Sequence, residues 1–231
     1  MSHDEDELLR PFDDPKMVAK YVEGPPRFVP GFADIHKMAS ILLAERAPGV
    51  ARVLVLGAGG GLELKAFAEM NAGWRFDGVD PAAEMLKLAR QTVAPYADRM
   101  QLHEGYIDDA PEGPFDAGAC LLTLHFLKQE ERRRTLAEIH RRLKPGAPFV
   151  AVHSSFPQAG EERDRWLSRY VAFALGSGAD PEQVRNMREA VSRSLSLLTP
   201  EEDEAVLRAA GFADVTLFYA AFTWRGWVAY A

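Results

Sequence analysis

The residues best suited to binding chemistry are a run of glycines between two apolar segments. The apolar segment 53–56 leads into Gly-Ala-Gly-Gly-Gly at 57–61, and a helical pattern follows over 62–70. A buried strand that turns through glycines into a helix presents backbone N–H groups to an anion. Gly57 allows a sharp turn, and Gly59 lets a ligand approach the backbone. Glycines also close tight turns without a ligand, but that reading leaves three consecutive glycines unexplained.

Asp80 is the second candidate, 23 residues after Gly57 and at the end of the second expected strand, 76–80. At this spacing an acidic side chain can accept hydrogen bonds from both hydroxyls of a ribose. The alternative is that Asp80 caps the helix that Pro81 opens, which is a common arrangement. The two roles are compatible, and the glycine turn favours the ribose.

Strands and helices alternate through the middle of the chain. Strands are expected at 53–56, 76–80, 100–103, 115–122 and 149–153, and helical patterns occupy 62–70, 82–93 and 130–143. The runs 53–56 and 115–122 consist almost entirely of apolar or small residues, as is typical of strands buried on both faces of a parallel sheet. This alternation predicts right-handed βαβ units and a doubly wound sheet.

The C-terminal part departs from the alternation. Two helices are expected over 161–175 and 180–195, and another over 201–210, before strands at 215–220 and 224–230. A parallel connection needs a dozen or more residues, so these last two strands must be antiparallel. We therefore expect an α/β fold with a doubly wound, mainly parallel seven-stranded sheet, an antiparallel C-terminal strand and a helical lid insertion.

Two classes of cofactor share the combination of glycine turn and acid: dinucleotides and S-adenosylmethionine. A dinucleotide fingerprint places a third glycine at its sixth position, for close packing of helix on strand. This chain has Leu62 there. A dinucleotide site also generally uses a second mononucleotide half, for which the antiparallel tail leaves little room. The residues therefore favour S-adenosylmethionine.

From about residue 53 to its end, the chain resembles the class I S-adenosylmethionine-dependent methyltransferases. The glycine turn, the strand 115–122 and Leu143-Lys144-Pro145-Gly146 carry the resemblance. It implies methyl transfer from S-adenosylmethionine but says little about the acceptor. Our leading hypothesis is a small-molecule acceptor, and we expect no metal site.

The resemblance also implies that the cofactor lies along the strand ends. Its methionine part would contact Gly57, Ala58 and Gly59, and its ribose would contact Asp80 and Pro81. The adenine would lie at Tyr106 and Ile107, and the reacting methyl near Leu121.

A narrower resemblance is to the carboxy-S-adenosylmethionine synthases, which make a carboxylated cofactor used in tRNA wobble-uridine modification. Segments 29–32, 123–127, 193–199 and 210–212 carry it. It makes a synthase-like activity the alternative to methyl transfer. A cofactor-binding module without catalysis is a further alternative, because no obvious polar catalytic set follows the strands.

Three positions depart from the synthase pattern. Phe32, Tyr106 and Leu121 stand where that family has a tyrosine, an aspartate and an asparagine. The arginine expected to hold the extra carboxylate has no counterpart in register, although Arg185, Arg188 and Arg193 lie nearby. An unpaired buried carboxylate would cost several kcal/mol. We therefore expect ordinary S-adenosylmethionine or its demethylated product to be bound. The alternative is the carboxylated cofactor, held by an arginine at a shifted position.

No catalytic residue is named from the sequence. His125 and His153 follow the fourth and fifth strands and could act as general bases, but a structural role at the sheet boundary is the favoured interpretation. Cys120 lies within an apolar strand and is expected to be a buried, inert thiol. Direct displacement on a sulfonium methyl needs no base when the acceptor is already a good nucleophile.

Composition limits the partners. The net charge is −7, and the basic residues of 132–144 are interleaved with Glu130, Glu131 and Glu138, which predicts a solvated, ion-paired helix face rather than a nucleic-acid surface. No apolar run approaches the roughly 18 residues of a membrane span. One cysteine in the chain favours a reducing cytoplasm. The aromatic tail 218–227 suits a sheet core or a homodimer contact.

The domain organisation follows from these patterns. We expect residues 1–50 to form an N-terminal helical cap, with a proline-rich start and a helix over 33–47. Residues 51–231 are expected to form the methyltransferase Rossmann-like domain, with the helical lid inserted at 156–198.

Overall fold

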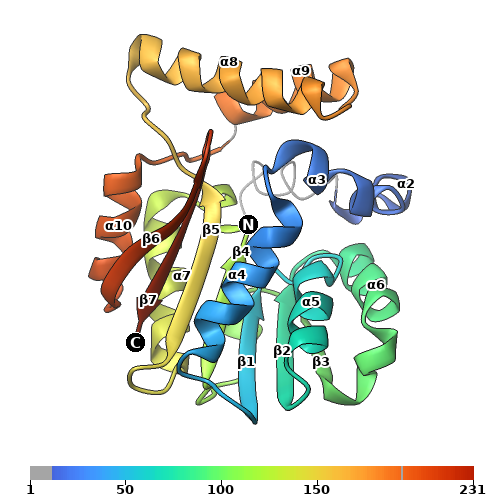
Figure 1. The fold of residues 1–231 in the computed structure, drawn as a ribbon, viewed down its shortest axis with the longest axis vertical. Coiled ribbons are helices and arrows are strands. Elements are labelled where there is room, and N and C mark those ends of the chain that lie inside the picture. The colour runs from blue at the N-terminus through green and yellow to red at the C-terminus, as the bar shows by residue number, and fades with distance from the viewer. Residues whose placement is uncertain (1–11, 194) are drawn as a thin grey trace.

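The computed structural model describes residues 12–193 and 195–231 and shows one sheet between two layers of helices (Figure 1). The strand order is β3-β2-β1-β4-β5-β7-β6. The strands are β1 (Ala51–Leu56), β2 (Trp74–Asp80), β3 (Met100–Glu104), β4 (Ala117–Leu121), β5 (Pro148–Ser154), β6 (Ala213–Ala221) and β7 (Trp224–Tyr230).

The first five strands are parallel to their neighbours, and β7 pairs antiparallel with both β5 and β6. The predicted seven-stranded, doubly wound sheet is therefore confirmed, including the antiparallel C-terminal strand. The order reverses direction at β1, where β2 and β4 lie on opposite sides. In open α/β sheets ligands bind beyond the carboxyl ends of the strands at such a switch point.

Alternate residues of β1 enter two different cores. Val53 and Val55 pack with residues of α4 (Phe32–Ala44) and α5 (Leu62–Met70) on one face. Leu54 and Leu56 pack with α7 (Gln129–Arg142) and α10 (Pro200–Ala209) on the other. Because both faces are covered, residues 53–56 of the central strand are all apolar, as the sequence indicated. Helix α6 (Ala83–Thr92) connects β2 to β3.

The N-terminal segment wraps the carboxyl edge of the sheet in short pieces. These are α2 (Pro15–Val18), the 3-10 turn η1 (Tyr21–Glu23) and α3 (Pro25–Phe28), which leads into α4. Prolines open α2 and α3, where a missing N–H costs nothing. Val18 packs against α6 in a small cluster with Ala82 and Met85.

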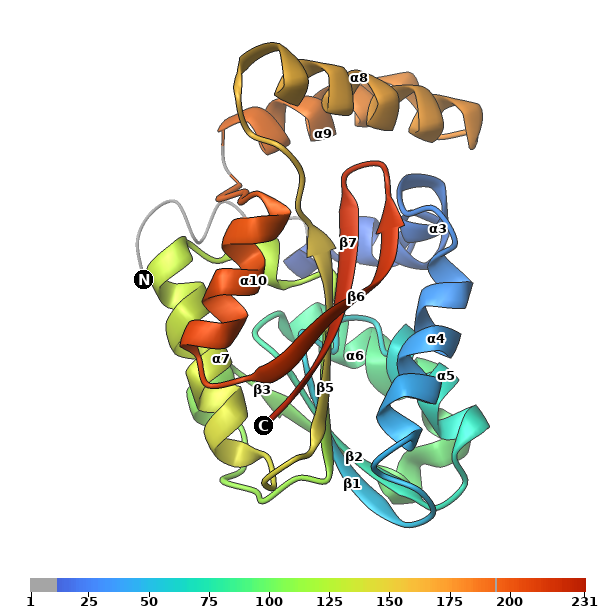
Figure 2. The same ribbon diagram turned by 60° about the vertical axis from the view of Figure 1, so that its left-hand side comes forward.

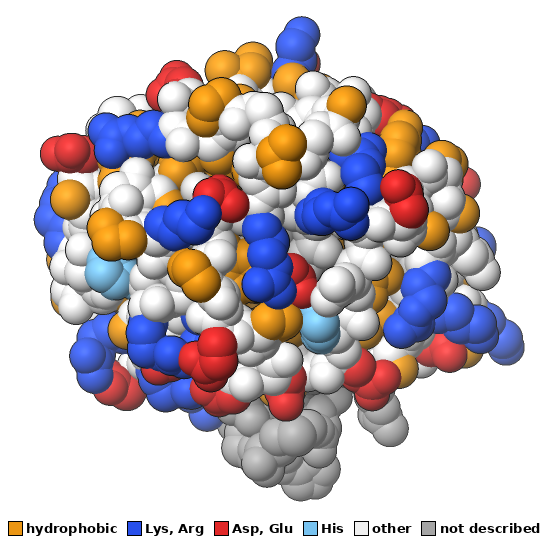
Figure 3. Space-filling view, turned by 90° about the horizontal axis from the view of Figure 1, so that it is seen from below, with side chains coloured by type: hydrophobic (Ala, Val, Ile, Leu, Met, Phe, Trp, Pro, Cys, Tyr) orange, Lys and Arg blue, Asp and Glu red, His pale blue; other side chains and the backbone are white. Residues whose placement is uncertain are grey.

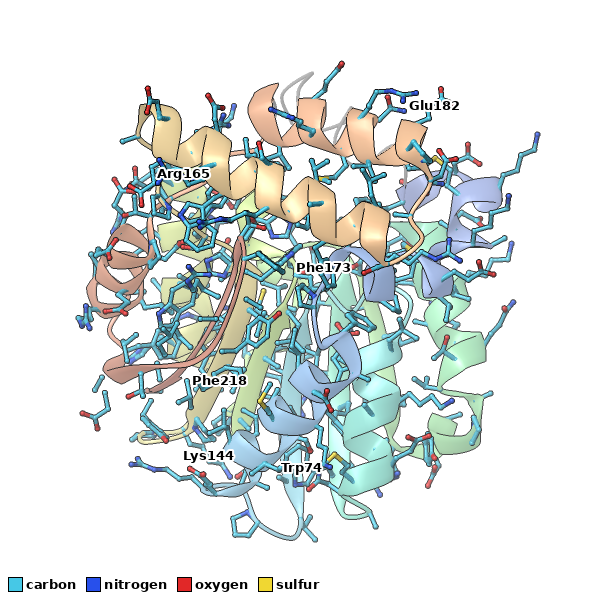
Figure 4. All side chains as sticks on the ribbon, turned by 45° about the horizontal axis from the view of Figure 1, so that its top comes forward. Trp74, Lys144, Arg165, Phe173, Glu182 and Phe218 are labelled. Atoms are coloured by element: carbon cyan, nitrogen blue, oxygen red, sulfur yellow. The ribbon has the colours of Figure 1, made fainter. Side chains whose placement is uncertain are left out.

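Helices α8 (Gly160–Gly176) and α9 (Pro181–Arg193) form a layer beyond the carboxyl ends of the strands, above the hairpin of β6 and β7 (Figures 1 and 2). Phe173 lies on the side of α8 that faces the sheet, and its ring is 5.6 Å from that of Phe222 (Figure 4). Tyr170 meets Trp224 edge to face at 6.2 Å. The insertion is thus packed on the hairpin through aromatic side chains.

The predicted solvated face of α7 is confirmed for Arg133 and Arg134 but wrong for Arg132 and Arg142. Arg133 and Arg134 are exposed and pair with acids one turn away. Arg132 is fully buried, because α10 covers that side of α7 and supplies Asp203. Arg142 is also buried, with its guanidinium on the Glu138 side chain. Charge spacing along one helix does not show which side a later segment will cover.

Candidate functional site

The glycine turn after β1 adopts the conformation that its residue types suggested. Gly57 has φ +76, and a Cβ there would lie 1.9 Å from Oγ1 of Thr123, so no side chain fits. The N–H groups of Gly57 and Ala58 donate to the carbonyl of Val79 at 2.8 and 3.0 Å. These bonds hold the turn against the end of β2, beside the residue that follows.

Asp80 connects the turn to the start of α6. One carboxylate oxygen accepts the N–H of Gly59 at 2.9 Å, and the other accepts the N–H of Ala82 at 2.9 Å. Burial raises the pKa of this carboxyl, and these two N–H donors oppose the rise. Asp80 therefore does support the helix start after Pro81, although Ala82 is the N-cap residue of α6. Each carboxylate oxygen retains a lone pair that can accept a ribose hydroxyl.

The end of β3 lies next to Asp80. The N–H of Gly105 donates to the Asp80 carbonyl at 3.1 Å, which brings Tyr106 and Ile107 to the neighbouring strand end. Ile107 is buried, whereas Tyr106 is 36% exposed. An apolar side chain and a partly exposed ring are both suitable neighbours for a flat heterocycle.

The end of β4 is apolar. Leu121 is 4% exposed, and its carbonyl accepts the Thr123 hydroxyl at 3.0 Å. Leu122 follows with φ +58, an uncommon conformation for a branched side chain. Cys120 is fully buried, and burial raises the pKa of its thiol, which supports the inert role expected of it.

Two side chains at the turn were not singled out from the sequence. Tyr21 of η1 lies on the glycine turn: a Cβ at Gly60 would be 3.2 Å from the Tyr21 ring, and one at Gly59 would be 3.7 Å from its hydroxyl. Glu63, in the first turn of α5, is 8% exposed. Its place two residues after the turn is a signal that sequence reasoning could have used. Nothing in the sequence places Tyr21 there.

A buried polar network lies beside the ends of β4 and β5. Arg132 donates to Asp203 at 2.6 Å and to the carbonyl of Ser196 at 2.6 Å, so it ties the segment after α9 to α7 and α10. His153 Nε2 lies 3.1 Å from the same oxygen of Asp203. Burial opposes ionisation of Asp203, but His153 and Arg132 together hold its pKa below the usual value.

His125 is also buried, with its Nδ1 lacking a hydrogen-bond partner. Burial lowers the pKa of this imidazole, and the nearby His153 lowers it further. These observations agree with the boundary role favoured for both histidines. Among the described residues, no group of three or more His, Cys, Asp or Glu side chains could hold a metal ion.

Comparison with known proteins agrees with this geometry. Residues 53–146, which include the turn, Asp80 and β4, match the family of methyltransferase domains. Residues 53–146 therefore form a methyltransferase domain, as predicted. The two solved structures described below hold S-adenosylhomocysteine or S-adenosylmethionine, which agrees with the predicted cofactor.

Among curated proteins, the chain is similar to carboxy-S-adenosyl-L-methionine synthases. It is 24% identical to that of Campylobacter lari, over 80% of this chain and 80% of the relative. It is 26% identical to that of Chromohalobacter salexigens, over 94% of this chain and 82% of the relative. The likeness therefore extends beyond residues 53–146 to the segments on either side of them.

Solved structures share the fold. PigF with S-adenosylhomocysteine has a TM-score of 0.68 at 19% identity, covering 96% of this chain and 61% of that one. Phosphoethanolamine N-methyltransferase 2 of Haemonchus contortus with S-adenosylmethionine has a TM-score of 0.69 at 16% identity, covering 100% of this chain and 60% of that one. This chain thus spans about 60% of the length of those two proteins.

Two surface features bear on partners. No helix among the described residues is long and apolar enough to cross a membrane. Seen from the side opposite α8 and α9, basic side chains lie beside acidic ones rather than in a single patch (Figure 3).

Proposed function

We propose that this protein transfers the methyl group of S-adenosylmethionine to a small-molecule acceptor at the carboxyl ends of β1, β2 and β4. The observation that carries the proposal is the hydrogen bond from Gly59 N–H to Asp80, which joins the glycine turn to the acid inside a methyltransferase domain. The cofactor-binding residues we assign are Gly57, Ala58, Gly59, Asp80, Pro81, Tyr106, Ile107 and Leu121.

S-adenosylmethionine supplies an electrophilic methyl on a sulfonium. Asp80, already fixed by two backbone donors, accepts the ribose hydroxyls without reorganising. Ile107 gives the adenine an apolar wall, and Leu121 gives one to the reacting methyl. The chain aligns acceptor, methyl and sulfur and keeps water away, and no side chain is assigned as a base.

In this proposal α8 and α9, within the insertion 156–198, form a lid over the acceptor. Residues 12–50 of the predicted 1–50 cap cover the cofactor, and residues 1–11 lie outside the described residues. The aromatic contacts of Phe173 and Tyr170 with the hairpin support this arrangement, because they hold α8 over the strand ends. The acceptor then lies between the lid and the end of β4. Membrane and nucleic-acid partners have no part in the proposal, and the location we propose is the cytoplasm.

A synthase-like activity on a carboxylated cofactor is the second candidate, since the curated relatives bear that name. An added carboxylate needs a cationic partner. Leu121 is apolar, Arg185 and Arg188 of α9 are exposed, and the side chain of Arg193 lies outside the described part of the chain. These positions favour the ordinary cofactor. Mass spectrometry of the nucleoside released from freshly purified protein distinguishes the two, because the carboxylated form is heavier by one carboxylate.

Calorimetry with S-adenosylmethionine, S-adenosylhomocysteine and NAD tests the proposal. We expect the first two ligands to bind and NAD to give no signal. Binding of NAD alone would favour a dehydrogenase. A broad screen of acceptors then tests for catalysis, since formation of S-adenosylhomocysteine above background excludes a module that only binds. Light scattering of the same sample decides between a monomer and the homodimer suggested by the aromatic tail.

A further inference from the structure

The starting observation is that the two connections between the sheet and the layer of α8 and α9 are joined to each other (Figure 2). The chain enters this layer through residues 155–159, the entry stem, and leaves it through residues 195–199, the exit stem. The Phe156 N–H donates to the Leu198 carbonyl at 3.3 Å, and the Ser155 hydroxyl donates to the same carbonyl at 3.3 Å. A group that holds the exit stem therefore holds the base of both helices.

The fully buried guanidinium of Arg132 joins three segments that are far apart in the chain. One terminal nitrogen donates to Asp203 of α10 at 2.6 Å, and the other donates to the carbonyls of Ser196 at 2.6 Å and Leu127 at 3.3 Å. Ser196 lies in the exit stem, and Leu127 follows the 3-10 turn η4 (Leu124–Phe126) after β4. Neither residue belongs to a helix or strand, so its carbonyl needs a partner outside the regular backbone ladders. Arg132 supplies that partner to both.

Leu127 belongs to a loop, residues 123–127, that lies against the glycine turn. Thr123 is in contact with the turn, since a Cβ at Gly57 would lie 1.9 Å from the Thr123 Oγ1. The N–H groups of the last two loop residues donate to carbonyls three positions earlier, at 3.0 and 3.1 Å, so the loop is a compact turn. Its first residue touches the cofactor site and its last touches Arg132. A ligand along the glycine turn therefore restrains a loop that is hydrogen-bonded to Arg132.

We propose that Arg132 is a positioning residue that couples the lid to the cofactor site. Occupation of the glycine turn fixes the loop 123–127, and Arg132 transmits this order to the exit stem, so that α8 and α9 are held over the acceptor once the methyl donor is bound. This inference rests on the proposed function, because the lid and the methyl donor are parts of it. Arg132 itself touches neither substrate. A lid ordered by the cofactor keeps water from the sulfonium and leaves the acceptor site accessible before the cofactor arrives.

The coupling depends on the shape of arginine and not only on its charge. A lysine carries its donors on one nitrogen, whereas a guanidinium presents them on separate nitrogens in a fixed fork. In Arg132→Lys, an ammonium beside Asp203 keeps the charge pair but loses the second nitrogen, which holds the exit stem and the loop. Arg142 is the matched control, because it is also buried on α7 and pairs with Glu138 of the same helix. Among the described residues, Arg142 makes no hydrogen bond or ion pair with either stem.

The experiment is amide hydrogen exchange of the full chain by NMR, with and without S-adenosylhomocysteine, for the wild type, Arg132→Lys and Arg142→Lys. The reporters are the N–H of Leu127, in the loop, and the N–H of Phe156, whose acceptor lies in the exit stem. In the wild type and Arg142→Lys, the ligand should slow exchange at both reporters at least about tenfold, the scale for one hydrogen bond from a charged group. In Arg132→Lys, the ligand should still slow exchange at Leu127, whereas Phe156 should exchange faster and no longer respond.

A general loss of stability would not give this result, because it would speed exchange at both reporters and in both variants. If Arg132→Lys does not fold, the double variant Arg132→Met/Asp203→Asn replaces it, since removing both charges leaves no buried charge unpaired. An equal ligand response at Phe156 in the wild type and the Arg132 variant, or a response at Leu127 alone in the wild type, would overturn the inference while leaving the proposed function intact. If the wild type bound neither S-adenosylmethionine nor S-adenosylhomocysteine, the proposed function itself would fail.

Discussion

The buried carboxyl of Glu63 makes the stability of the free protein depend on pH in a way that one substitution removes. Its pKa is raised from 4.5 in the unfolded chain to about 8 in the folded protein, because burial disfavours the charged form. Between these two values the folded state holds a proton that the unfolded state has lost. Unfolding therefore releases this proton, and stability falls as the pH rises through this range.

The magnitude follows from the size of the window. Each pH unit inside it changes the free energy of unfolding by about 1.4 kcal/mol for one proton. From pH 5.5 to 7.5 the wild type should lose about 3 kcal/mol relative to Glu63→Gln, whose amide does not titrate. Other groups, such as His36 with its pKa lowered by burial to about 4, are present in both proteins and cancel in the difference.

Urea unfolding of both proteins at several pH values, without cofactor, measures this difference. Glu69→Gln on the exposed side of α5 is the control and should follow the wild type at every pH. If the wild type and Glu63→Gln kept a constant difference from pH 5.5 to 7.5, Glu63 would be ionised in the free protein. The burial argument would then be refuted.

Three further substitutions test other parts of the structure. Asp80→Ala should weaken binding of S-adenosylmethionine by about 1.5–3 kcal/mol in calorimetry, while a thermal melt shows that the protein stays folded. Unchanged affinity with a large loss of stability would show that Asp80 is only a structural residue. Asp203→Ala leaves the buried Arg132 without its carboxylate and should cost about 3–5 kcal/mol in urea unfolding; a change below about 1 kcal/mol would contradict the buried pair. Gly57→Ala should lower the melting temperature strongly, because the new Cβ would have no room. Gly176→Ala should not lower it, because a Cβ at Gly176 would have no neighbouring atom within 4 Å, and equal effects of the two substitutions would contradict the tight turn.

The sequence predicted the fold because its signals are local. Apolar runs indicated strands buried on both faces, and helical periodicity indicated the helices between them. The few residues between the last two expected strands, which end at 220 and begin at 224, required an antiparallel hairpin, and the structure shows one. The sharp turn at Gly57 was also predicted, because a positive φ beside Thr123 leaves no room for a side chain. The binding of a ribose by Asp80 stays a prediction.

Only the tertiary structure decided which residues far apart in the chain come into contact. Arg132 lies 71 positions from Asp203, and its charged neighbours on α7 gave no sign that it is buried. Tyr21 reaches the glycine turn because α2 packs on α6, a contact that neither segment encodes alone. Local patterns reflect the preferences of each segment for helix, strand or turn. Which side chains meet depends on how those segments pack, and that is set by the burial of the whole chain.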